Sequence, residues 1–177
     1  MSIVKKWAGC VMAFIAGVLG LAMSASSGMV IKTPLGSSTT KAYKVITESE
    51  LMDTAKLLGV KSEFVLMKAF AIITLIIAVL LIAYSIVALL QNLNVIKSSH
   101  IAFDIAGWVL VGLFVISTIA LLVSSNGYAT AIEDSVIAAA SGIKSVKVGL
   151  YQPFMLVVSI IAAIVTGIFA FLKRKDA

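Results

Sequence analysis

An uncharged stretch from Ala69 to Ile96 constrains this chain more than any other feature of its sequence. Its centre, Ile72–Ile86, is almost all Ile, Leu, Val and Ala. A helix needs about 20 apolar residues to cross a bilayer, and this stretch is long enough. Three further runs share its character: Trp7–Ile31, Ile105–Ile132 and Val148–Leu172. The sequence therefore predicts an all-α membrane protein built as a bundle of four transmembrane helices.

Composition supports this class and predicts one domain. Of the 177 residues, 61% are hydrophobic and 12% are charged, whereas soluble domains are about 25% charged. We predict a single integral membrane domain over 1–177, because the spans and two modest loops use the whole length. The expected spans are about 7–27, 64–90, 104–125 and 152–172, and the expected outer loops are about 28–63 and 126–151.

The net charge of +6 points to lipid rather than to nucleic acid. The basic residues flank apolar spans, where they set orientation and attract anionic headgroups. The chain has no basic stripe and no aromatic stacking platform of the kind that binds nucleic acid. The expected partners are membrane lipids and other membrane protein chains, in a homo- or hetero-oligomer.

The N-terminal run has two interpretations. Lys5 and Lys6 precede the apolar run Trp7–Met23, and small residues follow it over Ser24–Gly28. The same order describes a secretory signal peptide. We favour a retained span because the run is long enough to cross. Cys10 is the one cysteine, so an intrachain disulfide is excluded. We interpret it as a small packing residue, with acylation as the alternative.

Small residues four apart predict close helix packing in two spans. Residues of this size let a second helix approach its neighbour's backbone. The predicted helix-packing residues are Ala13, Ala16, Gly17, Gly20, Ala163 and Gly167. We expect the small faces of the first and fourth spans to meet.

The first outer loop predicts a hairpin. Met29–Ile31 reads as a strand, Pro34–Thr40 as a turn and Ala42–Ile46 as a second strand. Thr47 and Glu50 then fit a capping box. That box predicts a short helix with an apolar face, which Gly59 ends.

The second outer loop predicts a turn, a helix and a strand. Asn126-Gly127 is a turn signal, and Thr130 with Glu133 repeats the capping box. The expected helix is Ala131–Ala140, ended by Gly142. Lys144–Leu150 alternates as a strand does, with its valines on one face. We expect it to join the hairpin in a small extracytoplasmic β/α cap made from both loops.

This order of elements resembles the claudin-type four-span proteins. The resemblance rests on the predicted hairpin at Met29–Ile46, the short inner link and the predicted strand at Lys144–Leu150. It implies an outer sheet built from both loops over a left-handed helix bundle. It lies in the layout alone, and no functional residue is carried over from it.

Charge density sets the predicted orientation. An even number of spans puts both ends on one side, together with the link that contains Lys97. Basic residues are denser on this side than in the two longer loops, so both termini are predicted to be cytoplasmic. The expected location is the plasma membrane, as a multi-pass protein.

Candidate chemical groups are few. The centres of the spans carry no ionisable residue, which disfavours an ion or proton path. Asp104 reads as a helix-start charge and His100 as a solvated link residue, with a His100–Asp104 pair as the alternative. Glu133 and Asp134 read as first-turn helix charges. We predict no catalytic, metal or cofactor-binding residue and no cofactor.

The sequence thus favours a non-catalytic membrane protein. It would act as an accessory, scaffolding or self-associating subunit through helix packing and folded outer loops. The alternative is an oligomeric passive pore or permeation subunit, lined by hydroxyls: Ser85, Ser117, Thr118, Ser159 or Thr166. A membrane enzyme ranks third, since it would need a partner chain or cofactor.

Overall fold

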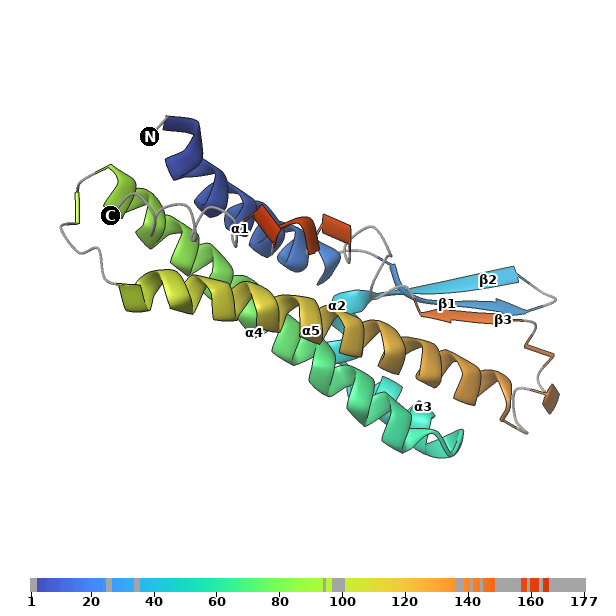
Figure 1. Cartoon of the computed structure of the whole chain (residues 1–177). Helices are drawn as coiled ribbons and strands as arrows, with labels where there is room; N and C mark the ends of the chain where they lie inside the picture. The colour runs from blue at the N-terminus through green and yellow to red at the C-terminus, as the bar shows by residue number, and fades with distance from the viewer. Residues whose placement is uncertain are drawn as a thin grey trace. The chain divides into compact units, whose positions relative to one another are not determined.

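The structure is a computed structural model of the whole chain (Figure 1). It describes residues 3–24, 27–33, 36–93, 95–96, 101–135, 139–140, 142–143, 145–148, 157–158, 160–162 and 164–165. The elements, in chain order, are α1 (Ile3–Ser24), β1 (Ser27–Thr33), β2 (Gly36–Lys41), α2 (Ala42–Thr47), α3 (Glu50–Leu57), α4 (Lys61–Asn92), α5 (Ile101–Glu133) and β3 (Ser145–Val148).

The chain forms two compact units. We call the first the helical unit; it comprises Met1–Leu21, Leu75–Ser117 and Pro153–Ala177. We call the second the sheet unit; it comprises Ala22–Thr74 and Thr118–Gln152. The long helices α4 and α5 each contribute residues to both units.

Two of the described helices are long and apolar enough to cross a membrane. They are Lys61–Asn92 and Ile105–Glu133. The apolar part of α1, Trp7–Met23, is shorter. The described residues thus support a mostly helical chain with two of the four predicted spans. Most of the predicted fourth span, Gln152–Leu172, lies outside them.

Both long helices bury one narrow stripe of side chains. On α4 the stripe is Phe64, Met67, Ala71, Thr74, Ala78, Leu81 and Ser85, with Ile77 buried beside it. On α5 it is Gly107, Val111, Phe114, Thr118, Leu121, Ser125, Tyr128 and Ile132, with Ser117 and Ser124 buried beside it. Successive members are alternately three and four residues apart, which is the seven-residue repeat of a coiled-coil seam. We call these two stripes the seam.

Helices α4 and α5 pair within each unit. In the sheet unit the rings of Phe64 and Tyr128 have centroids 5.4 Å apart. Thr74 lies ten residues after Phe64 on α4, and Thr118 lies ten residues before Tyr128 on α5. Both are buried. In the helical unit Tyr84 stacks on Phe103 with centroids 4.7 Å apart. Each unit therefore contains an antiparallel pair of helix segments.

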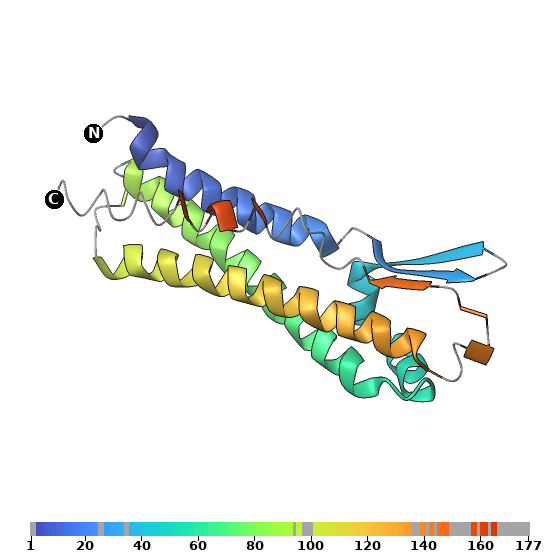
Figure 2. The ribbon, with the colours of Figure 1, turned by 45° about the vertical axis from the view of Figure 1, so that its right-hand side comes forward.

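The sheet has the strand order β2-β1-β3, and both pairs are antiparallel (Figure 2). Met29 and Val146 are buried on one face, whereas the next residue of β3, Lys147, is exposed on the other. The predicted strand after Lys144 and its pairing with the first loop are confirmed. Gly28 lies where the β1–β2 register shifts, and a Cβ there would be 2.6 Å from Ala42 Cα.

The predicted second strand of the hairpin is wrong. Ser37–Thr40, predicted as part of a turn, belongs to strand β2, and Ala42–Ile46, predicted as a strand, belongs to helix α2. The chain reverses between Thr33 and Gly36, where Gly36 has φ +145°, a conformation open to glycine. Ala42 and Val45, three apart, are both buried, and this spacing suits a helix face.

The predicted capping box of Thr47 and Glu50 is also wrong, although the short helix that it predicted is present as α3. Thr47 Oγ1 donates to Tyr43 O at 3.0 Å within α2, and α3 begins at Glu50 without a side-chain cap. The predicted stop at Gly59 is confirmed, with φ +76°. Gly59 N donates to Lys56 O and Val60 N donates to Ala55 O, which together form a Schellman motif.

Helix α5 runs through the predicted second turn. Asn126-Gly127 is helical, and α5 ends only at Glu133, so the predicted turn and the predicted helix start at Ala131 are wrong. The reason is burial: Tyr128 and Ile132 continue the seam in the sheet unit and outweigh the local turn preference. Gly142 has φ +66°, as a helix-ending glycine does.

Candidate functional site: the helix-packing surfaces

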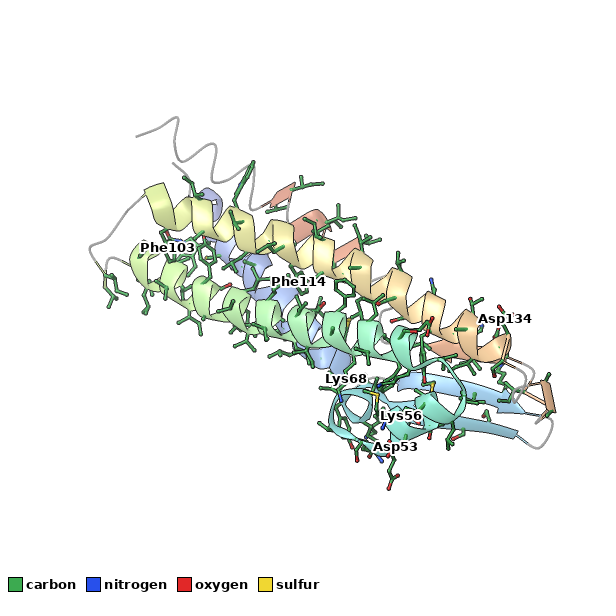
Figure 3. All side chains as sticks on the ribbon, turned by 90° about the horizontal axis from the view of Figure 1, so that it is seen from below. Asp53, Lys56, Lys68, Phe103, Phe114 and Asp134 are labelled. Atoms are coloured by element: carbon green, nitrogen blue, oxygen red, sulfur yellow. The ribbon has the colours of Figure 1, made fainter. Side chains whose placement is uncertain are left out.

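The small residues of α1 lie in the interior of the helical unit. Ala13 and Ala16 are fully buried in one cluster with Ala78, Leu81 and Phe114. Helix α1 therefore packs with its small face against α4 and α5 within this unit. Phe114, labelled in Figure 3, is the large side chain of this cluster.

Gly17 and Gly20 mark the closest approach of α1 to its neighbours. A Cβ on Gly17 would be 2.7 Å from Ile82 Cγ1 and 2.8 Å from Ala78 O. A Cβ on Gly20 would be 2.8 Å from Ala78 Cβ and 3.1 Å from the Phe114 ring. Because Ala78 O is a backbone atom, even alanine at Gly17 requires the helices to move apart.

The expected partner of the α1 small face was the fourth span. Ala163 and Gly167 lie outside the described residues. The neighbouring Ala162 is fully buried in the same cluster as Ala13 and Ala16. The partner contacts that the structure describes for Gly17 and Gly20 come from α4 and α5.

A second close approach joins α4 to α5 in the helical unit. A Cβ on Gly107 would overlap the Tyr84 ring. Tyr84 also stacks on Phe103 with an interplanar angle of 22°. Gly107 therefore makes the space in which an aromatic side chain of α4 crosses onto α5.

The buried hydroxyls bond mainly to their own helices. Ser85 Oγ donates to Leu81 O at 2.6 Å, Thr74 Oγ1 to Phe70 O at 2.8 Å and Ser117 Oγ to Phe114 O at 3.0 Å. Ser125 differs, because its Oγ is buried without a hydrogen-bond partner among the described residues.

Large apolar side chains cover the outside of the same helices. On α4, Ile76 is 55% exposed, and on α5, Ile116 is 64% and Val123 is 66% exposed. The stripe that each helix buries contains Ser, Thr, Ala or Gly among its members. Along their uncharged stretches the helices are therefore about as apolar outside as inside, whereas the core of a soluble protein is its most apolar part.

The predicted chemical residues are dispersed. Cys10 is buried and its Sγ donates to Trp7 O at 3.1 Å. Asp104 lies in the first turn of α5, as predicted, whereas His100 lies outside the described residues. Within the described part of the chain, no three His, Cys, Asp or Glu side chains gather as metal ligands would.

Glu133 has a structural task that the sequence did not indicate. It is the last residue of α5, so its interpretation as a first-turn helix charge is wrong. Its Oε1 accepts a hydrogen bond from Val146 N at 2.7 Å. The carboxylate thus joins the end of α5 to strand β3 in the sheet unit.

The seam was missed by sequence reasoning. Helices α4 and α5 are apolar all round, so apolar periodicity does not separate a buried face from an exposed one. The usable signal is polarity: Thr74 and Ser85 on α4, and Thr118 and Ser125 on α5, fall on seam positions. In a lipid-facing helix, hydroxyls and small residues mark the packed face.

No family model, no curated protein and no solved structure matches this chain.

Proposed function

We propose that this chain is a non-catalytic integral membrane protein that works as an accessory, scaffolding or self-associating subunit of a membrane assembly. One observation carries the proposal: along the uncharged stretches of α4 and α5 the exposed side chains are apolar and mostly large, while the Ser and Thr hydroxyls are buried. Such a surface is costly in water and suits hydrocarbon. The expected neighbours are therefore lipids and the helices of other chains.

The length of the helices supports a specific insertion depth. Helix α4, with 32 residues, is about 48 Å long, whereas the hydrocarbon core is about 30 Å thick. The uncharged part of α4 begins at Ala69, after Lys61, Glu63 and Lys68. We place the turns before Ala69 outside the hydrocarbon, with the Phe64–Tyr128 contact holding them to the end of α5.

The proposal keeps the four-span topology with both termini in the cytoplasm. Helix α1 and the span near Ala162 would complete the bundle, and Ala162 shares a buried cluster with Ala13 and Ala16. The sheet drawn from both loops would then be extracytoplasmic, in the layout that resembles claudin-type proteins. Labelling of the two ends with a membrane-impermeant reagent in sealed cells tests this orientation.

A subunit role is favoured over a pore. A pore would need hydroxyls such as Ser85 and Ser117 to line a water path between chains. Both are buried and bonded to carbonyls of their own helix. The accessory role needs only the packed interior, the apolar outside and the folded loop elements.

Mass determination of the native particle after gentle extraction tests the proposal. A particle of fixed stoichiometry with other chains supports an accessory subunit, and a particle made only of copies supports a scaffold. A protein that is monomeric and without partners in native membranes contradicts both. Solute flux through reconstituted vesicles would instead favour the pore.

A further inference from the structure

Charges are segregated within the sheet unit. The strands β1, β2 and β3 contain three lysines and no acidic residue: Lys32, Lys41 and Lys147. By contrast, helix α3 of this unit contains Glu50 and Asp53 beside Lys56. The charges on the sheet itself are therefore purely cationic.

The strand register puts all three lysines on one face. Lys147 pairs with Val30, two residues from Lys32, so both lysines point to the same side of the sheet. Val30 also pairs with Thr39, two residues from Lys41. Lys32 and Lys147 are diagonal neighbours, which lie about 7–8 Å apart. Lys41 lies further along the same face, at the end of β2. We call this surface the lysine face.

The lysine face points to solvent, and its charges are not neutralised by the described chain. Lys32, Lys41 and Lys147 are exposed, and none makes an ion pair with a described residue. By contrast, Lys44 Nζ lies 3.0 Å from Glu48 Oε1 and Lys56 Nζ lies 2.7 Å from Asp53 Oδ1 (Figure 3). The helical lysines Lys44 and Lys56 thus have acidic partners, whereas the three strand lysines have none among the described residues.

We propose that the lysine face binds the phosphate-bearing surface of an anionic lipid bilayer. Charge complementarity requires an anionic partner, and lysines spread over three strands match a sheet of headgroups better than one small ligand. Exposed hydroxyls of Ser37 and Thr39 share the face and can donate to phosphate oxygens. Strand β1 begins at Ser27, directly after the apolar helix α1 ends at Ser24, so the chain itself keeps the sheet near lipid.

The lipid-binding proposal rests on the proposed membrane insertion, and the following experiment tests binding and insertion separately. The full chain is inserted into nanodiscs of phosphatidylcholine, and vesicles of phosphatidylcholine with or without phosphatidylglycerol are added and floated. Failure to enter nanodiscs would count against insertion. Once inserted, the protein is expected to float with the anionic vesicles only, and to release them in 1 M salt, which shortens the screening length to about 3 Å.

Lysine variants identify the surface. Each lysine near an anionic surface contributes about fivefold in binding, so K147Q is expected to lose about fivefold and K32Q/K41Q/K147Q about 100-fold. The matched control K44Q/K56Q/K61Q removes equal charge from helical elements of the same unit and should bind almost as the native chain does.

Three results would overturn the proposal. They are equal flotation with both kinds of vesicle, an equal loss in the control variant, and binding of polyglutamate but not of anionic vesicles through the same three lysines. The last result would assign the face to an acidic polypeptide instead.

Discussion

Gly17 is where α1 has no space for a side chain. Since a Cβ would come within 2.8 Å of Ala78 O, a backbone atom, Gly17→Ala is expected to destabilise the protein by about 1–3 kcal/mol through overpacking. Thermal unfolding in detergent, followed by circular dichroism, measures the effect.

Gly112 provides the matched control for Gly17. It is also helical, but a Cβ there meets nothing within 4 Å. Gly112→Ala should therefore raise stability by about 0.5–1 kcal/mol, because alanine restricts the unfolded chain. Equal melting temperatures for the two variants would show that α1 does not approach α4 as closely as described.

Ser125 carries a hydroxyl in an unfavourable place. Its Oγ is buried with no hydrogen-bond partner among the described residues, a state that costs about 1–3 kcal/mol. Ser125→Ala is thus expected to keep or raise the melting temperature and to melt above Ser85→Ala, whose native hydroxyl bonds to Leu81 O. The reverse order would imply that Ser125 has a partner in the folded protein.

At the scale of elements, Glu133 protects an edge of the sheet. Val146 N points away from β1 and would be an unpaired edge donor without the carboxylate. Glu133→Ala is expected to cost about 1 kcal/mol locally and to speed amide exchange in Ser145–Val148 about fivefold. Glu133→Gln keeps an acceptor and should exchange more slowly than Glu133→Ala. Unchanged exchange in both variants would remove this role.

Sequence reasoning predicted the elements whose signal is local. Helix α4 follows from apolar length, β1 and β3 follow from their composition and alternation, and the end of α3 follows from Gly59. The β2–α2 segment was misassigned because a Ser/Thr-rich run is typical of a turn, whereas pairing with β1 holds this run in a strand. The continuation of α5 depended on burial of Tyr128, which only the fold determines.

The packing surfaces were predictable only in part. The small-residue pairs of α1 are visible as a spacing, and the structure places Gly17 and Gly20 against α4 and α5. Their neighbours could not be chosen from the sequence, because the small-residue pattern fits several partners equally well. The Glu133–Val146 hydrogen bond joins residues of two elements, so no local pattern announced it.

Membrane insertion of the whole protein depends on where the apolar side chains of α4 and α5 point. The described surface of these helices is covered by large residues such as Ile76 and Ile116, and the described buried side chains of both helices include no Lys, Arg, His, Asp or Glu. A protein organised this way is expected to leave membranes only with detergent. Its helices associate through close packing and hydroxyl groups, because lipid tails are as apolar as the side chains and give no hydrophobic driving force.

Spin-label accessibility measures whether Ile76 and Ile116 face lipid or water. In a Cys10→Ser background, single labels at Ile76 and Ile116 in bilayers should collide often with oxygen and rarely with a water-soluble nickel complex. A label at Asp53, an exposed position on α3, should show the opposite. Ready collision of the Ile76 and Ile116 labels with the nickel complex would place these helices in water and contradict the account.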